Sequence, residues 1–147
     1  MKQILLLLSV FIFSFQSGRQ VGQPGAEVKY PKNIILLIGD GMGLAQVTAG
    51  MYASKKPLYL EQFTATGLMK THAHKNLITD SAAGATAFSC GQKTINNAIG
   101  VLPPDFKPCT TILEDLDHRG YATGMVVTCS APHATPASFI AHREIRA

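Results

Sequence analysis

Runs of apolar residues along the chain predict two strands that are covered on both faces. The first, Ile34–Ile38, is rich in β-branched residues, contains no polar position and is short for a helix. The second, Tyr121–Thr128, is interpreted as another buried strand, and residues 64–72 alternate between polar and apolar around Gly67 as a further strand would. Apolar runs without alternation are typical of strands in a parallel sheet, where both faces are buried.

Helices are predicted between and after these runs. They are expected over Leu44–Ala53, from Asp80 to a stop at Gly91, over Thr110–Arg119, and from Pro136 onward. Thr79 or Asp80 is a suitable N-cap for the second helix, and Gly120 a suitable C-terminal stop for the third. Thr135 can cap the fourth, because proline is favoured at the first helical position.

This order of elements predicts an α/β fold with a mainly parallel sheet sandwiched by helices. Asn, Gly and Pro residues mark Gln92–Pro108 as a long loop, and loops of that length are usually functional or flexible. Arg143 and Arg146 lie three residues apart on the last predicted helix, where a basic patch that faces solvent is the common explanation.

The N-terminal residues have the pattern of a secretory signal peptide, predicted over residues 1–20. A cationic start precedes the apolar run Ile4–Phe15, which small and polar residues follow. The run is about 12 residues long, against the ~20 that a membrane-spanning helix needs, so no stable membrane anchor is expected. Residues 21–31 are predicted to be a flexible lead and residues 32–147 the folded part. The protein is therefore expected to be exported, to the periplasm or the medium.

Composition and charge narrow the class of protein. Apolar residues make up 46% of the chain and charged residues 15%, which is typical of a globular protein. The formal net charge of +4 suits anionic substrates. The 13 basic residues are scattered and form no stripe with interleaved aromatic residues, so we expect no nucleic-acid partner.

The three cysteines, Cys90, Cys109 and Cys129, could form a disulfide in an oxidising compartment. An odd number leaves one of them free or paired outside the chain, and the sequence leaves the pairing open. Cys129 lies at the end of an apolar run and is interpreted as a small buried side chain. No spacing among the cysteines favours a metal or redox site.

Asp40 and His133 follow two of the predicted strands and are candidate metal ligands. Ligands of open parallel sheets bind beyond the carboxyl ends of the strands, so neighbouring strands would bring this carboxylate and this imidazole together. Both groups bind divalent metals. A simple turn aspartate explains Asp40 equally well. The other histidines have no recognisable ligand spacing: His72, His74, His118 and His142.

Ser81 is a candidate nucleophile because it falls in the first turn of the helix that opens at Asp80. Free N–H groups and the positive end of the helix dipole favour an anion there and stabilise an alkoxide. A serine nucleophile needs such activation. An aspartate and a serine before an alanine-rich helix are also an ordinary cap, and the residues alone favour the cap.

Together these segments resemble the alkaline phosphatase family. The resemblance lies in three motifs in the family's order: NIILLIGDGMG from Asn33 to Gly43, TDSAAGATA from Thr79 to Ala87, and HATPA from His133 to Ala137. It implies an alkaline-phosphatase-like α/β fold and hydrolysis of phosphate monoesters through a phosphoserine. It also implies two zinc ions, one magnesium ion and a homodimer for the full-length protein.

The resemblance assigns roles to residues position by position. Ser81 would be the nucleophile, Arg146 would bind the phosphate, and Asp80 would help to orient that arginine. The carboxylate of Asp40 would be shared between zinc and magnesium. His133 and Thr135 fall in the magnesium segment of the family. His133 occupies a position that is aspartate in some members, and Thr135 occupies the position of the Ser or Thr hydroxyl.

Family members are several times longer, and their other zinc ligands lie beyond the matched part. We therefore expect the chain to be an N-terminal fragment of the catalytic domain, with an incomplete sheet and no activity alone. Two alternatives stay open. One is a non-catalytic secreted phosphate-binding module, and the other is a phosphodiesterase or sulfatase of the same superfamily, although the Asp80–Ser81 context favours a monoesterase.

Overall fold

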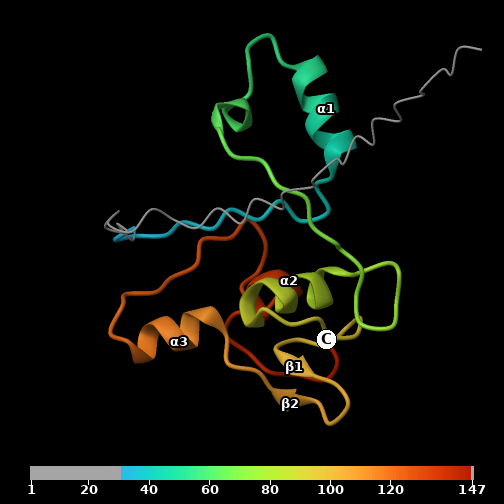
Figure 1. Cartoon of the computed structure of the whole chain (residues 1–147), viewed down its shortest axis with the longest axis vertical. Helices are drawn as coiled ribbons and strands as arrows, with labels where there is room; N and C mark the ends of the chain where they lie inside the picture. The colour runs from blue at the N-terminus through green and yellow to red at the C-terminus, as the bar shows by residue number, and fades with distance from the viewer. Residues whose placement is uncertain (1–30, 147) are drawn as a thin grey trace, which may run out of the picture. The chain divides into compact units, whose positions relative to one another are not determined.

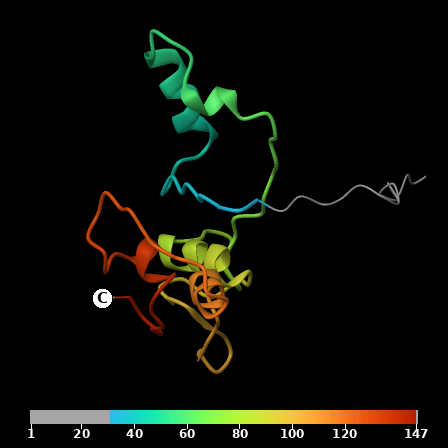
Figure 2. The same cartoon turned by 90° about the vertical axis from the view of Figure 1, so that its left-hand side faces the viewer.

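The computed structural model describes residues 31–146 (Figures 1 and 2), and its contacts group the chain from Leu37 onward into one unit. The predicted signal peptide and nearly all of the predicted lead lie outside the described residues. Among the residues that are described, no helix is both long enough and apolar enough to cross a membrane.

The described part of the chain is mainly helical. Its helices are α1 (Leu44–Ala53), the 3₁₀ helix η1 (Tyr59–Gln62), α2 (Ser81–Cys90), α3 (Ile112–His118) and α4 (Ala134–Ala137). The helices predicted at α1, α2 and α3 are confirmed. Helix α2 packs against both α4 and α3, so the central helix of this part is the one that begins at Ser81 (Figure 1).

Polar caps set the ends of α2 and α3. The side chain of Asp80 accepts a hydrogen bond from the backbone N–H of Ala83, and Gly91, with φ +69°, ends α2 in the left-handed conformation. At the start of α3, Thr111 and Glu114 form a capping box in which each side chain accepts from the backbone N–H of the other. Both helices therefore begin at positions fixed by their own side chains.

Helix α4 begins earlier than predicted. The N–H of Ala137 donates to the carbonyl oxygen of His133 at 2.9 Å, so His133 is the N-cap and Thr135 lies inside the helix. The predicted continuation through the two arginines is wrong. Arg143 instead forms an antiparallel bridge with Ile99, because the backbone there bonds to the 97–99 segment rather than to its own preceding turn.

The only sheet among the described residues is a short antiparallel hairpin of β1 (Val101–Leu102) and β2 (Lys107–Pro108), inside the predicted long loop. The runs predicted as strands, Ile34–Ile38, residues 64–72 and Tyr121–Thr128, form no ladder in the described structure, and most of their side chains are exposed. A strand exists only through hydrogen bonds to a neighbouring strand, and no described segment supplies one to these runs.

The buried core lies where α2 meets α4. Small side chains of both helices pack with Ile99 in one cluster: Ala82, Ala134 and Ala137. Cys90 at the end of α2 forms a disulfide with Cys109, whose Cα lies 5.9 Å away, and this bond ties α2 to the segment before α3. Cys129 is free and exposed within the described structure, so its interpretation as a buried residue is wrong.

Two fully buried threonines differ in how their hydroxyl groups are satisfied. The hydroxyl of Thr86 accepts from the N–H of Gly100 at 3.0 Å and lies within hydrogen-bond distance of Ala98 and Ser138. The hydroxyl of Thr94 has no hydrogen-bond partner among the described residues. Thr86 therefore joins α2 to the 98–100 segment and to the end of α4, whereas the Thr94 hydroxyl contributes only its volume.

This pair gives a matched test of the buried polar network. Thr86→Val should lower the free energy of unfolding by about 1–3 kcal/mol, because it leaves the buried N–H of Gly100 without a hydrogen-bond acceptor. Thr94→Val should leave it unchanged or raise it, since no hydrogen bond is lost. Urea denaturation followed by circular dichroism measures both. If both variants lost the same free energy of unfolding, the account would be wrong, because the change in side-chain packing alone would then explain the losses.

Candidate active site

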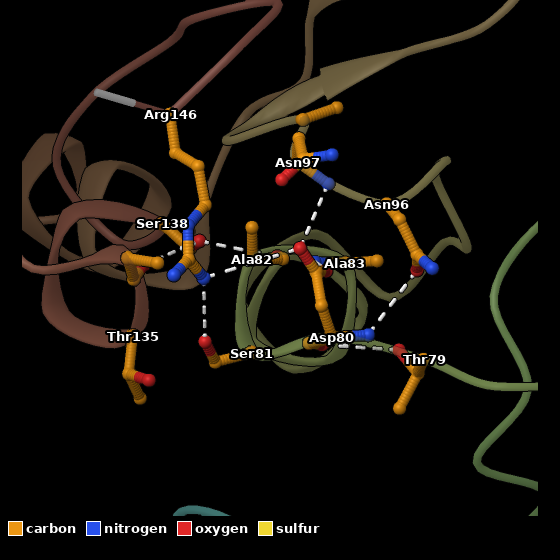
Figure 3. Close-up of polar contacts among 12 residues, drawn as sticks. Thr79, Asp80, Ser81, Ala82, Ala83, Asn96, Asn97, Thr135, Ser138 and Arg146 are labelled. Carbon is orange, nitrogen blue, oxygen red and sulfur yellow. Dashed lines mark hydrogen bonds and ion pairs between the residues drawn. The ribbon is translucent and has the colours of Figure 1, made fainter.

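Ser81 and Arg146 meet at the N-terminal end of α2 although 65 residues separate them (Figure 3). The Nη1 of Arg146 donates to the Oγ of Ser81 at 2.9 Å. Ser81 is the first residue of α2, so its side chain stands beside backbone N–H groups that have no partner within the helix. A hydroxyl, a guanidinium and a helix N-terminus at one point favour binding of an oxyanion.

Asp80 connects the start of α2 to the segment that leads toward the arginine. Its Oδ1 accepts from the N–H of Ala83 and its Oδ2 from the N–H of Asn97, each at 2.9 Å. Its Oδ2 also lies 3.9 Å from the Nη1 of Arg146. The cap interpretation of Asp80 is therefore confirmed. The ion pair is long and partly exposed, so its direct contribution to stability is small.

Asn96 and Asn97 belong to the site, and the sequence analysis did not identify them. The side chain of Asn96 accepts from the N–H of Asp80 at 3.1 Å and donates to the carbonyl oxygen of Ile78 at 3.0 Å (Figure 3). The carbonyl oxygen of Asn97 accepts from the N–H of Arg146 at 2.8 Å. The one sequence signal was the asparagine pair itself, since asparagine tolerates the positive φ of +70° that Asn97 adopts.

Asp40 and Thr135 form a second pair. The hydroxyl of Thr135 donates to the Oδ2 of Asp40 at 2.9 Å across 95 residues of sequence. Asp40 stands in a tight turn that closes from the N–H of Met42 to the carbonyl oxygen of Gly39 at 3.1 Å, with Gly41 at φ +66°. That conformation favours glycine, so the predicted turn is present. The contact of Asp40 with the α4 segment is made by Thr135, whereas the sequence had paired Asp40 with His133.

The donor atoms of this second pair suit magnesium. Carboxylate and hydroxyl oxygens are hard ligands of the kind that Mg²⁺ binds. His133 is exposed at the start of α4, and its side chain makes no hydrogen bond to Asp40 or Thr135 in the described structure. Zinc takes three or four His, Cys, Asp or Glu ligands, and residues 31–146 contain no cluster of three such side chains. The described residues thus offer two oxygen donors at this point, from Asp40 and Thr135, and contain no cluster of zinc ligands.

Comparisons with known proteins agree on one family. The family model for alkaline phosphatase matches residues 31–147. Over 118 residues the chain is 45% identical to an alkaline phosphatase of Schizosaccharomyces pombe, a match that covers 76% of the chain and 22% of that enzyme. It is 41% identical to the streptomycin-6-phosphate phosphatase of Streptomyces griseus, over 76% of the chain and 26% of that protein.

Solved structures give the same result. The alkaline phosphatase of the Antarctic bacterium TAB5, as a histidine-to-aspartate mutant with magnesium bound in its M3 site, matches with a TM-score of 0.78 at 47% identity. The match covers 82% of the chain and 34% of that structure. It confirms the predicted fold class, an incomplete α/β fold of this kind. The chain spans about a fifth to a third of the length of these relatives.

The two acceptor oxygens of Asp80 lead to a prediction about stability. Asp80→Ala removes the helix cap and the bond to Asn97, and should lower the free energy of unfolding by about 1–2 kcal/mol. Asp80→Asn keeps one acceptor oxygen and should cost less. Asp105→Ala, which removes only an exposed ion pair with Lys107, serves as the matched control and should be nearly neutral. Urea titration would contradict the account if Asp80→Asn cost as much as Asp80→Ala.

Proposed function

Because the chain belongs to the alkaline phosphatase family, we propose that it carries the nucleophile of a phosphate monoester hydrolase, with Ser81 forming a phosphoserine intermediate. The observation that carries the proposal is the 2.9 Å hydrogen bond from Arg146 to the hydroxyl of Ser81 at the N-terminus of α2. Aspartate and serine cap many helices, but a cap needs no arginine directed at the serine oxygen. This contact favours a nucleophile over a purely structural serine.

The chain's own residues would first bind the phosphate group. The planar guanidinium of Arg146 can hold two oxygens that are not transferred, while the free N–H groups of α2 favour the same negative charge. Asp80 and Asn97 would keep the arginine in place from both sides, through the ion pair and through the backbone bond to Arg146. The phosphorus would then stand next to the Oγ of Ser81.

Two displacements would follow. The Oγ of Ser81 attacks phosphorus in line as the bond to the ester oxygen breaks, and the alcohol leaves with a proton. Water then attacks the phosphoserine, the Ser81 Oγ–phosphorus bond breaks, and the serine regains its proton as phosphate leaves. Arg146 would stabilise the charge that develops on the equatorial oxygens in both steps, and its N–H would favour ionisation of the Ser81 hydroxyl.

Metal ions would complete the centre. Asp40 and Thr135 would hold magnesium through their oxygens, with His133 nearby in the same segment. The two zinc ions proposed from the family would supply Lewis acidity at the attacking and leaving oxygens. Asp40 is the one zinc ligand that we propose from this chain, and the others would belong to the remainder of the full-length protein.

The wider setting is proposed on the same basis. Residues 32–147 would be the N-terminal part of the catalytic domain, preceded by a signal peptide over residues 1–20, and the full-length protein would be an exported homodimer. The disulfide between Cys90 and Cys109 supports export, because such bonds persist in oxidising compartments. The substrates would be phosphate monoesters, recognised chiefly through the phosphate group.

Replacement of the nucleophile is the direct test. In the protein expressed from its complete gene, Ser81→Ala should reduce hydrolysis of a phosphomonoester by several orders of magnitude. Acid quench with a labelled substrate, followed by peptide mass spectrometry, should find phosphate on Ser81 in the unmodified protein. Ser81→Ala activity at the level of the unmodified protein would exclude the mechanism. Phosphate binding without hydrolysis would favour the non-catalytic binding module instead.

A comparison of two arginines tests the phosphate-binding assignment. Arg146→Ala should weaken competitive inhibition by inorganic phosphate about 10- to 100-fold, because charge-assisted hydrogen bonds are lost. Arg143→Ala removes the same charge from an exposed side chain three residues away and is the matched control. It should change the inhibition constant less than threefold or so. A larger effect at Arg143 than at Arg146 would overturn the assignment.

A further inference from the structure

The imidazole of His142 lies between two hydrogen-bond acceptors. Its Nδ1 is 2.6 Å from the carbonyl oxygen of Gly100, and its Nε2 is 2.9 Å from the Oε1 of Glu114. A carbonyl and an ionised carboxylate offer only lone pairs, and a neutral imidazole has a single N–H. Both contacts are therefore hydrogen bonds only when the ring carries two protons, and loss of one proton leaves one nitrogen lone pair facing an oxygen.

The surroundings favour the charged ring. The Oε2 of Glu114 accepts from the N–H of Thr111, which, with the hydrogen bond from His142, holds the pKa of Glu114 below its usual value. Partial burial lowers the pKa of His142, but the hydrogen bonds to Gly100 and Glu114 outweigh it and raise the pKa above its ordinary value. The two contacts of His142 with Gly100 and Glu114 are thus complete below the pKa of the folded state, where Glu114 is ionised, and one of them is lost as the pH rises through that pKa.

Few other charges face the ring. His118 of α3 shares a cavity of about 210 Å³ with His142 and Glu114. On the other side, Arg143 and Glu144 line a cavity of about 480 Å³ with it, and the hairpin contributes only uncharged side chains to these two cavities. Glu114 is accordingly the one carboxylate within hydrogen-bond distance of His142 in the described structure.

The contact with Gly100 connects His142 to the arginine. Ile99 and Arg143 exchange two backbone hydrogen bonds of 2.8 Å, and the N–H of Arg146 donates to Asn97 at 2.8 Å. The 142–146 segment thus lies along the 97–100 segment, with His142 at one end and Arg146 at the other. A Cβ on Gly100 would come within 2.8 Å of the Nδ1 of His142, so glycine permits this approach.

We propose that His142 is a proton-dependent positioning residue, whose doubly protonated ring holds the 142–146 segment on Gly100 and α3 and thereby keeps Arg146 directed at the phosphate beside Ser81. The inference rests on the proposed function, because the phosphate is that of the proposed reaction. Deprotonation of His142 frees one end of the segment, so the protein binds phosphate less tightly at alkaline pH and releases the product more readily.

Glu114→Gln separates proton dependence from mere structure. The carboxamide oxygen can still accept from the N–H of Thr111, while the amide N–H₂ can donate to the Nε2 of a neutral His142. Nδ1–H then donates to Gly100, so both contacts survive without the charge. His142→Gln offers one donor group only and loses a contact at every pH. His118→Gln changes an exposed histidine on α3, the helix that carries Glu114, and is the matched control.

The test uses the protein expressed from its complete gene, with ¹⁵N in histidine and arginine. In the unmodified protein, both ring nitrogens of His142 should be protonated below a titration midpoint that lies above that of an ordinary histidine, and the side-chain signals of Arg146 should shift with the same midpoint. In Glu114→Gln the His142 midpoint should fall and the Arg146 shift should vanish. The proposal is wrong if the Arg146 signals do not change as His142 titrates, or if the His142 ring is neutral below pH 6. Either result counts against it whether or not the protein hydrolyses phosphate esters.

Inhibition by inorganic phosphate supplies the functional measurement. The quantity to follow is the inhibition constant of the unmodified protein divided by that of Glu114→Gln, measured at each pH. This ratio should rise about three- to tenfold as the pH passes through the His142 titration, as expected for one lost hydrogen bond. This ratio cancels the ionisation of phosphate itself. His118→Gln should follow the unmodified protein, and His142→Gln should bind weakly at all pH values. If the inhibition constant of Glu114→Gln rises with pH as much as that of the unmodified protein, the proposal is refuted. If the protein hydrolyses no phosphate ester but the NMR signals of His142 and Arg146 still titrate together, only the proposed function is refuted.

Discussion

The carboxylate of Asp80 is the group that joins the two segments from which the candidate site is built. One of its oxygens caps α2, and the other binds the N–H of Asn97, while its own N–H donates to the side chain of Asn96. The first contact fixes where Ser81 enters the helix. The others fix the 96–97 segment, which holds the backbone of Arg146. A serine and an arginine 65 residues apart therefore meet through hydrogen bonds that converge on one side chain.

A second set of contacts, among small residues, brings α4 against α2. Alanines on both helices allow their backbones to approach closely, and the buried hydroxyl of Ser138 binds carbonyl oxygens of Ala82 and Ala134. Larger side chains would separate the helices and unpair these groups. The same approach sets Thr135, on α4, relative to Ser81, on α2. The proposed metal ligand and the proposed nucleophile thus belong to one packed pair of helices.

The sequence predicted the parts of the fold that depend on local chemistry. Asp80 and Gly91 mark the ends of α2, and the three motifs identified the family, because caps and motifs are properties of neighbouring residues. It did not predict that residues 143–146 would bond to residues 97–99, since pairing of distant segments leaves no period in either one. Asn97 and His142 were missed for that reason: each acts through a partner that only the folded chain supplies.

The two halves of the site differ in what holds them. Ser81 and Arg146 are fixed by a helix cap, a backbone bridge and the histidine contact, none of which requires a parallel sheet. Asp40 instead follows the apolar run Ile34–Ile38, whose side chains are 37–85% exposed, and its described side-chain contact is the single bond to Thr135. Apolar strands are held chiefly by burial on both faces. The proposed metal half therefore depends on covering that run, whereas the proposed phosphate-binding half is already organised by its own polar contacts.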